Sequence, residues 1–302
     1  YDAETLELIS FVEVGALPDM VAFTADGQYV LTANEGEPSD DYSVDPEGSV
    51  SVVDISDPQN PVAATADFTA FNGQEDELRD QGVRIFGPGA NTAQDLEPEY
   101  IALSANSKTA WVTLQENNAL VKLDVTSATV TDILPLGEID RGEDGFGIDA
   151  SDKDEVINIK TWPGVVGQYQ PDAIHAYQIA GRTFLVTANE GDARAWGEDN
   201  DAYWGEEADE DAVPPVACTP DASHGFVEEF RVKHLVHNSG FARRCGDDLP
   251  PQLSELADGA LLDPAVFGYC GAEAGDSGDC REDDVLGRLN ITWTLGYKTN
   301  AD

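Results

Sequence analysis

The sequence predicts an all-β chain organised as a β-propeller. Short segments rich in β-branched and aromatic residues dominate it, and Gly, Asn, Asp or Pro bounds each of them. The pentapeptide TANEG occurs twice, at residues 32–36 and 187–191. Helical periodicity is confined to residues 74–82 and 251–262. A chain of 302 residues is long enough to bury the core of one large all-β domain, which we place at residues 1–302.

Three segments share one plan, at residues 17–37, 97–125 and 170–192. Each begins with proline and an acid, continues as an apolar strand, a tight turn and a second apolar strand, and ends in a polar triplet that contains Glu. The sequences ADGQ, ANSK and AGRT are the expected hairpin turns. GSVSVVDIS and ALVKLDVTS follow the first two triplets and are expected to form third strands. Repeated units of this kind place equivalent loops on one rim.

The spacing of the repeat leaves the number of blades open. The initial prolines Pro18, Pro98 and Pro171 are separated by 98 − 18 = 80 and 171 − 98 = 73 residues. A propeller blade takes about 40–50 residues, so each interval holds either two blades or one blade with an insertion. Residues 71–95 are rich in Gly and acids and form a candidate insertion. Residues 194–284 form a second one, acidic and cysteine-containing, which we expect to be a loop-rich, disulfide-tied excursion within the domain.

Charge is the extreme feature of the composition. The chain has 59 acidic and 16 basic residues and a net charge of −43. This argues against nucleic acid as a partner, because phosphate contacts need a basic face. Solubility in salt, cation binding and repulsion of acidic partners all remain open. The sequence also lacks a run of about 18 apolar residues, so we expect no membrane span.

Several features indicate an exported protein. The chain begins at Tyr1 without a leader, as a processed N-terminus does. Its four cysteines are even in number, clustered and free of a CxxC motif, which favours two disulfides over a zinc site. Three pairings are possible, and sequential pairing (Cys218 with Cys245, Cys270 with Cys280) closes the shortest loops. Asn290 begins the single N-x-T glycosylation sequon, Asn290-Ile291-Thr292.

The Asn-Glu-Gly triplets are candidate calcium ligands. Calcium takes six to eight oxygens, and Asn and Glu supply side-chain oxygens while Gly lets the backbone turn. The alternative is that the triplet only turns the chain and that Glu is solvated. The candidate ligands are the triplet residues and nearby acids: Asn34, Glu35, Asp40, Asp41, Glu116, Asn189, Glu190 and Asp192.

The evidence for catalysis is thin. The sequence has no Gly-x-Ser-x-Gly elbow, no phosphate-binding Gly loop and no His-Glu-x-x-His. The four histidines, His175, His224, His234 and His237, are interpreted as surface or core residues. No catalytic residue is therefore assigned. A carboxylate-only hydrolase that uses metal-bound water stays open.

Four segments together resemble a known family: LPDMVAFTADGQYVLTANEGEP, QPDAIHAYQIAGRTFLVTANEGDAR, FVEEFRVKHL and LGRLNITWTLG. They resemble the choice-of-anchor I family of secreted bacterial β-propellers, which is related to the mesenchyme-specific cell surface glycoprotein. The resemblance runs from about residue 8 to residue 296. It implies export, a surface or matrix location and association with calcium or biomineral, and some members are labelled alkaline phosphatases. Family members continue into further blades, so we expect an incomplete propeller or one that another chain closes.

Three hypotheses for function follow. The first is an extracellular calcium-binding β-propeller that acts as a cell-surface or matrix binding module. The second is a self-assembling structural protein that forms an extracellular filament or surface layer, with a second chain completing the propeller. The third is a metal-dependent phosphoesterase.

Overall fold

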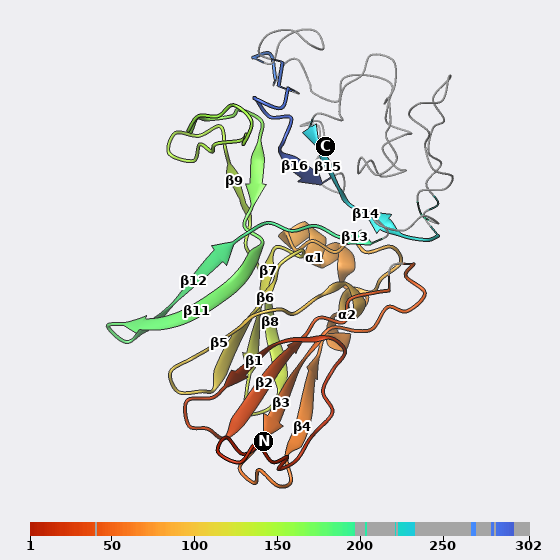
Figure 1. Cartoon of the computed structure of the whole chain (residues 1–302), viewed down its shortest axis with the longest axis vertical. Helices are drawn as coiled ribbons and strands as arrows, with labels where there is room; N and C mark the ends of the chain where they lie inside the picture. Colours follow the sequence, from red (N-terminus) through yellow and green to blue (C-terminus); the bar gives the residue numbers. More distant parts are fainter. Residues whose placement is uncertain are drawn as a thin grey trace. The chain divides into compact units, whose positions relative to one another are not determined.

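The computed structural model describes residues 1–39, 41–196, 203, 221, 223–232, 267–269, 279–280 and 282–292 (Figure 1). The chain divides into two compact units. The first comprises Tyr1–Pro38, Val44–Gly137 and Gln168–Asp192, and the second comprises Ser39–Ser43, Glu138–Gly167 and Ala193–Asp302.

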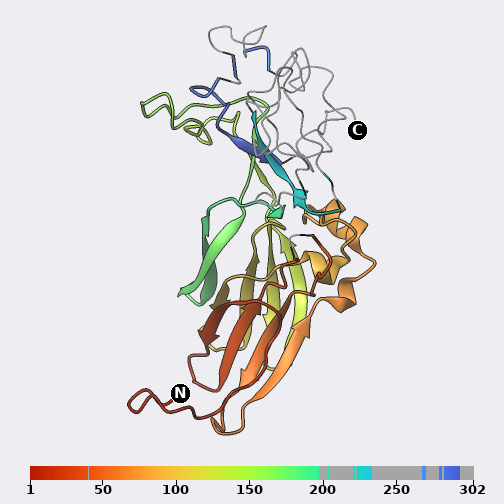
Figure 2. The ribbon, with the colours of Figure 1, turned by 45° about the vertical axis from the view of Figure 1, so that its right-hand side comes forward.

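The first unit contains two four-stranded antiparallel sheets and a hairpin (Figures 1 and 2). In each sheet the strands follow one another in chain order, as in a propeller blade. The first sheet contains β1 (Pro18–Phe23), β2 (Tyr29–Asn34), β3 (Ser49–Asp54) and β4 (Val62–Asp67). The second contains β5 (Ile101–Leu103), β6 (Thr109–Leu114), β7 (Ala119–Asp124) and β8 (Thr129–Pro135), and the hairpin contains β11 (Pro171–Ile179) and β12 (Arg182–Asn189).

The repeat is one sheet long, with an insertion after the first sheet. The predicted turns and third strands are confirmed, because β1–β2, β5–β6 and β11–β12 are hairpins and β3 and β7 follow them. The insertion contains η1 (Thr69–Phe71), α1 (Glu75–Gln81) and α2 (Thr92–Asp95). Helix α1 lies in the segment predicted to be helical and ends at Gly82, whose φ is 100°. No helix of the described residues is long and apolar enough to cross a membrane.

The second unit is also formed of β-structure. Its described pairs are β9 (Glu138–Asp140) with β10 (Val166–Gln168), β13 (Ala195–Trp196) with β14 (Phe226–Val227), and β15 (Glu229–Arg231) with β16 (Asn290–Thr292). The chain is thus mostly β, as a propeller-like fold requires, and no sheet of the described residues closes on itself. Most of the insertion predicted at residues 194–284 lies outside the described residues.

The core of the first unit lies between the two sheets. Leu31 and Val50 of the first sheet and Val112 and Val121 of the second are fully buried in one apolar cluster. A smaller cluster, formed by Ala102, Leu120 and Ile174, continues from the second sheet to the hairpin. Successive side chains of a strand point to opposite faces of its sheet. The second sheet can therefore pack against the first sheet on one face and against the hairpin on the other.

A glycine allows the first sheet to lie close to the insertion. The Gly48 N–H donates to the Ala93 carbonyl oxygen at 2.9 Å, just before β3 begins. A Cβ at Gly48 would collide with the carbonyl oxygen of Leu96 and would lie 2.8 Å from Pro98 Cδ. Backbone atoms cannot yield as a flexible side chain can. Only glycine fits here.

We therefore predict that Gly48→Ala lowers the free energy of unfolding by about 2–4 kcal/mol, as overpacking against a fixed backbone does. Gly27→Ala is the matched control, because Gly27 has a φ of 70° with no atom near its added Cβ. We expect it to cost only about 1 kcal/mol, from the left-handed backbone alone. Urea unfolding of both variants measures the difference. Equal costs would contradict the close approach.

Candidate functional site

The proline–acid pairs begin the first strand of the first sheet and of the hairpin. Pro18 pairs with Asn34, and Pro171 pairs with Asn189. In both pairs the register shifts over the next residue, so that the acid occupies a β-bulge. A bulge re-aims the side chain of the extra residue. The bulged acids are Asp19 and Asp172.

The equivalent acid of the second sheet is Glu99, which is buried. Its N–H donates to the Thr113 carbonyl oxygen at 3.1 Å, just before β5 begins at Ile101. The Tyr100 N–H donates to Thr113 Oγ1 at 2.9 Å, so the side chain of Thr113 takes part in the same irregular start. Strands β1, β5 and β11 lie side by side in the first unit. Their starts therefore bring the acids of the three repeats near one another.

The acid at the end of the second strand occupies a different register in the two sheets. Val21 pairs with Thr32 and Ile101 pairs with Val112, which makes Gln115 the counterpart of Glu35. The alignment of the triplets made Glu116 the equivalent of Glu35, but in the structure Glu116 lies one residue beyond that position. The two Glu side chains nonetheless approach, because the charge of Glu116 is one of those that act on Glu35.

Glu35 is half-buried among carboxylates. Burial raises its pKa to about 7, and the negative charges of Glu37, Asp19 and Glu116 add to the shift. Its backbone is fixed, since its N–H donates to the Leu17 carbonyl oxygen at 2.9 Å. Glu35 therefore holds a proton at a pH where an exposed glutamate is ionised.

Glu99 and Glu116 form the centre of this group. Burial raises the pKa of Glu99 far above its usual range, and the charge of Glu116, a hydrogen bond to the Glu116 side chain, and the charges of Glu35 and Asp172 raise it further. Such a hydrogen bond requires that one of the two carboxyls be protonated, because two carboxylates are both acceptors. Glu116 Oε2 is buried and has no hydrogen-bond partner. We call Glu35, Glu99 and Glu116 the carboxylate cluster.

The residues around Glu116 are held by the insertion. Arg84, which is buried, donates from Nη1 to the Glu116 carbonyl oxygen at 2.7 Å. Asn117 Nδ2 donates at 2.8 Å to the carbonyl oxygens of Arg84 and Asp95. Asn117 Oδ1 also accepts from the Glu97 N–H. The insertion at residues 71–95 thus anchors the loop that presents the central carboxylate.

Two residues of the first TANEG copy have structural roles. Asn34 is fully buried, and its Nδ2 donates to Ser49 Oγ at 3.2 Å and to Ser51 Oγ at 3.0 Å. Gly36 has a φ of 71°, and a Cβ there would lie 2.8 Å from the carbonyl carbon of Glu47. The triplet turns the chain, as the alternative interpretation holds, and Glu35 also joins the cluster.

The other predicted ligands lie elsewhere. Asp41 is exposed in the second unit, and hydrogen bonds from Ser43 and Ser39 lower its pKa to about 2. Asp40 lies outside the described residues. Three are exposed at the end of β12: Asn189, Glu190 and Asp192. Their assignment as ligands stays a prediction.

Sequence reasoning noted the acids of the proline–acid pairs as part of the repeat and did not assign them to the site. Glu99 is a member of the cluster, and Asp19 and Asp172 act on it through their charges. The signal was present, because each pair begins a repeat and equivalent positions of adjacent units converge. In the described residues, no three His, Cys, Asp or Glu side chains are already close enough to hold a metal ion. Cation binding there would require the carboxylates to draw together.

The remaining predicted sites have partial descriptions. Cys280 is buried and disulfide-bonded, whereas Cys218, Cys245 and Cys270 lie outside the described residues, so the pairing stays a prediction. Asn290 is exposed in β16, and its Nδ2 donates to Glu229 Oε2 at 2.8 Å. Of the histidines, His175 and His224 are exposed, and His234 and His237 lie outside the described part.

Residues 1–235 match the family described as the choice-of-anchor I domain. This chain belongs to the choice-of-anchor I domain family. Membership confirms the resemblance in the TANEG segments and indicates an extracellular, surface-associated module. No curated protein matches the chain.

Two solved structures show weak similarity. One is dihydro-heme d1 dehydrogenase NirN in complex with DHE, at a TM-score of 0.30 and 14% identity, with 60% of this chain and 24% of that chain covered. The other is hydrazine synthase of Kuenenia stuttgartiensis, at a TM-score of 0.27 and 12% identity, with 64% and 55% covered. The chain thus spans a quarter to about half of those chains. Similarity at this level defines neither fold nor activity.

The raised pKa of Glu35 predicts a pH-dependent stability. Its protonated form stabilises the fold fully below the unfolded pKa, near 4.5, and this contribution is lost as the pH rises through the folded pKa of about 7. In chelator, Glu35→Gln should therefore gain stability relative to wild type between pH 4.5 and 7. We expect on the order of 1 kcal/mol, because solvent screens a half-exposed group.

Urea unfolding across this pH range measures the effect. Glu77→Gln, on the exposed face of α1, is the matched control and should follow the wild type. A pH profile of Glu35→Gln that also parallels the wild type would show that Glu35 titrates normally.

Proposed function

We propose that this chain is a calcium-binding, surface-associated extracellular module, with the carboxylate cluster as its cation site. The observation that supports this most is the buried, unpartnered Oε2 of Glu116, in a side chain that also shares a hydrogen bond with Glu99. A buried carboxylate needs a proton, a cation or a hydrogen-bond donor. At neutral pH a divalent cation supplies more charge than the one shared proton.

The chemistry of the donors favours calcium. The cluster offers only hard oxygens, which calcium prefers, and the described histidines are exposed outside it. Glu35 comes from the first sheet, Glu99 and Glu116 come from the second, and Asp172 begins the hairpin. An ion held by these residues ties the three repeats together. Binding also offsets part of the repulsion within a chain of net charge −43.

Neutralisation by calcium also suits an extracellular module. Millimolar calcium outside the cell falls in the range at which extracellular modules bind it. The ion would hold the starts of β1, β5 and β11 at a fixed spacing, and the surfaces of the sheets would then serve as the binding faces of the module. The role of the chain's own residues is to bury, orient and separate the carboxylates until the ion displaces their proton.

Calcium should raise the melting temperature at pH 7.5 and fixed ionic strength, because it binds the folded state alone. At a hundredfold excess over Kd the gain is about 2.7 kcal/mol, which corresponds to several degrees in a chain of this size. Scanning calorimetry in calcium, in magnesium and in chelator, with elemental analysis of the purified protein, measures it.

The variants Glu99→Gln and Glu116→Gln should abolish most of the calcium-dependent rise, and the surface control Glu77→Gln should retain it. Asp41→Asn should also retain it, because Asp41 is exposed and its carboxylate already accepts hydrogen bonds from Ser39 and Ser43. A calcium-dependent rise that survives Glu99→Gln and Glu116→Gln would place the ion elsewhere. No rise and no bound metal would refute the proposal.

A further inference from the structure

Two glutamates of the carboxylate cluster are each next to a buried asparagine. Asn34 directly precedes Glu35, and Asn117 directly follows Glu116. Both asparagines are fully buried, although asparagine is mostly exposed in folded proteins. A buried amide has to satisfy its donor and acceptor groups through hydrogen bonds, so each asparagine holds the backbone beside its glutamate in place.

The amide of Asn117 is held by the insertion. Its Nδ2 donates at 2.8 Å to the carbonyl oxygens of Arg84 and Asp95, and at 3.1 Å to the Asp95 carboxylate. Asp95 is itself buried, and its carboxylate also accepts from the N–H groups of Phe86 and Gly87. The Arg84 N–H donates in return to the Asn117 carbonyl oxygen at 2.9 Å. Two of the acceptors are backbone carbonyls, which cannot donate, so this position requires a donor.

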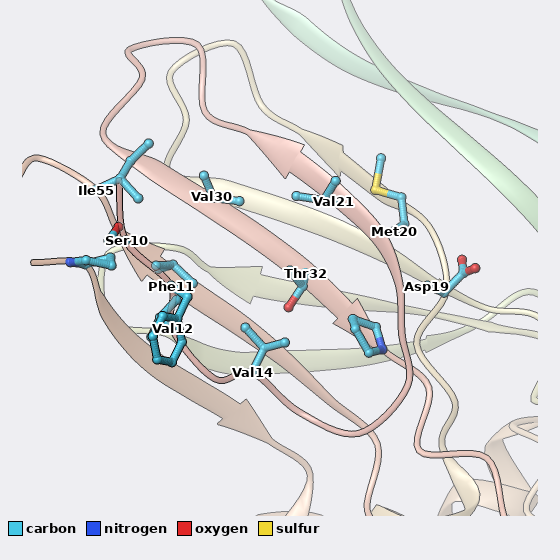
Figure 3. Close-up of a pocket in the computed structure, with 13 residues that line it drawn as sticks. Ser10, Phe11, Val12, Val14, Asp19, Met20, Val21, Val30, Thr32 and Ile55 are labelled. Atoms are coloured by element: carbon cyan, nitrogen blue, oxygen red, sulfur yellow. The ribbon is translucent and has the colours of Figure 1, made fainter. Parts of the chain in front are cut away.

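The amide of Asn34 is held within the first sheet. Its Nδ2 donates to the hydroxyls of Ser49 and Ser51 on β3. Its Oδ1 accepts from Thr32 Oγ1 at 2.9 Å, and Thr32 lines the cavity on the outer face of this sheet (Figure 3). Both ends of the amide are thus engaged inside the sheet. The two repeats hold their glutamates through the same residue type but through different neighbours.

The third repeat provides a comparison within the same chain. Asn189 of the second TANEG copy is exposed, and so is Glu190 beside it. Glu190 is not among the charges that raise the pKa of Glu35. Glu116, in contrast, acts on Glu35 although it lies one residue out of register, and its neighbouring asparagine is buried. Membership of the cluster therefore follows the buried asparagine more closely than it follows the sequence motif.

We propose that Asn34 and Asn117 are positioning residues of the cation site: neither contacts the ion, and each fixes the backbone from which the adjacent glutamate reaches it. The inference rests on the proposed function, because it concerns the ion proposed there. The carboxylates still draw together on the ion, but from backbones that are already in place. Ligands held in this way bind more tightly, since less conformational freedom is lost on binding. Removal of groups that hold metal ligands typically weakens binding by about 10- to 100-fold.

The variant Asn117→Asp separates positioning from direct binding of the ion. It keeps the shape of the side chain, adds a carboxylate next to Glu116 and removes the donor to two backbone carbonyls. If Asn117 were a ligand, or if charge alone set the affinity, the variant would bind calcium at least as tightly as wild type. Positioning predicts a calcium dissociation constant raised at least about tenfold. Titration calorimetry at pH 7.5 and fixed ionic strength measures it, on protein shown to be folded by circular dichroism.

A double variant, Ser49→Ala with Ser51→Ala, tests the other anchor without altering the asparagine itself. It removes only two hydroxyls, so it also tests the proposal if Asn117→Asp does not fold, and it should raise the calcium dissociation constant about tenfold. Ser104→Ala is the matched control. Ser104 is buried and accepts from the Thr109 N–H at 3.0 Å, at the end of β6 opposite the cluster. Its loss should lower the free energy of unfolding and leave the dissociation constant unchanged.

The outcomes distinguish this inference from the proposed function. If either folded anchor variant binds calcium as tightly as wild type does, the positioning role is overturned and the cation site stands. If Ser104→Ala weakens binding as much as the anchor variants do, the loss of affinity reflects stability alone, and the positioning role is again overturned. If wild type binds no calcium, both proposals are overturned.

Discussion

The contact between Leu31 and Val50 of the first sheet and Val112 and Val121 of the second is the packing on which the rest of the first unit depends. The second sheet has buried apolar side chains on both faces, so it needs cover on both. The second sheet meets this requirement, with the first sheet on one face and the hairpin β11–β12 on the other. Stacking of this kind aligns equivalent strands, and the starts of β1, β5 and β11 lie together as a result.

Alignment of the strands has an electrostatic consequence. A repeat that begins with proline and an acid places one carboxylate at each strand start, and packing of the sheets buries the middle one, Glu99. The packing that stabilises the sheets therefore works against the ionisation of these acids. The raised pKa values of Glu35 and Glu99 express this conflict. Protonation of the buried carboxyls resolves it, and we propose that a divalent cation resolves it when it displaces that proton.

Much of the fold could be predicted from the sequence because its signals are local. Alternating apolar strands and Asp-Gly, Asn-Ser or Ala-Gly turns specify hairpins, and these were confirmed at all three repeats. The carboxylate cluster was found only in part. Glu35 and Glu116 were identified from the triplets, but Glu99 was not, because its burial results from the packing of neighbouring sheets. The one-residue offset of Glu116 depends on strand register, and the anchoring by Arg84 and Asn117 is a tertiary contact, so neither is visible in the sequence.

Proton release on calcium binding shows directly whether the ion replaces a proton in the carboxylate cluster. If the ion replaces the proton shared by Glu99 and Glu116, titration calorimetry near pH 7 should give heats that differ between two buffers of unlike ionisation enthalpy. The difference should correspond to release of about one proton per bound ion, since ligands must be deprotonated to bind. Calcium binding with identical heats in the two buffers, or no binding at all, would contradict the account.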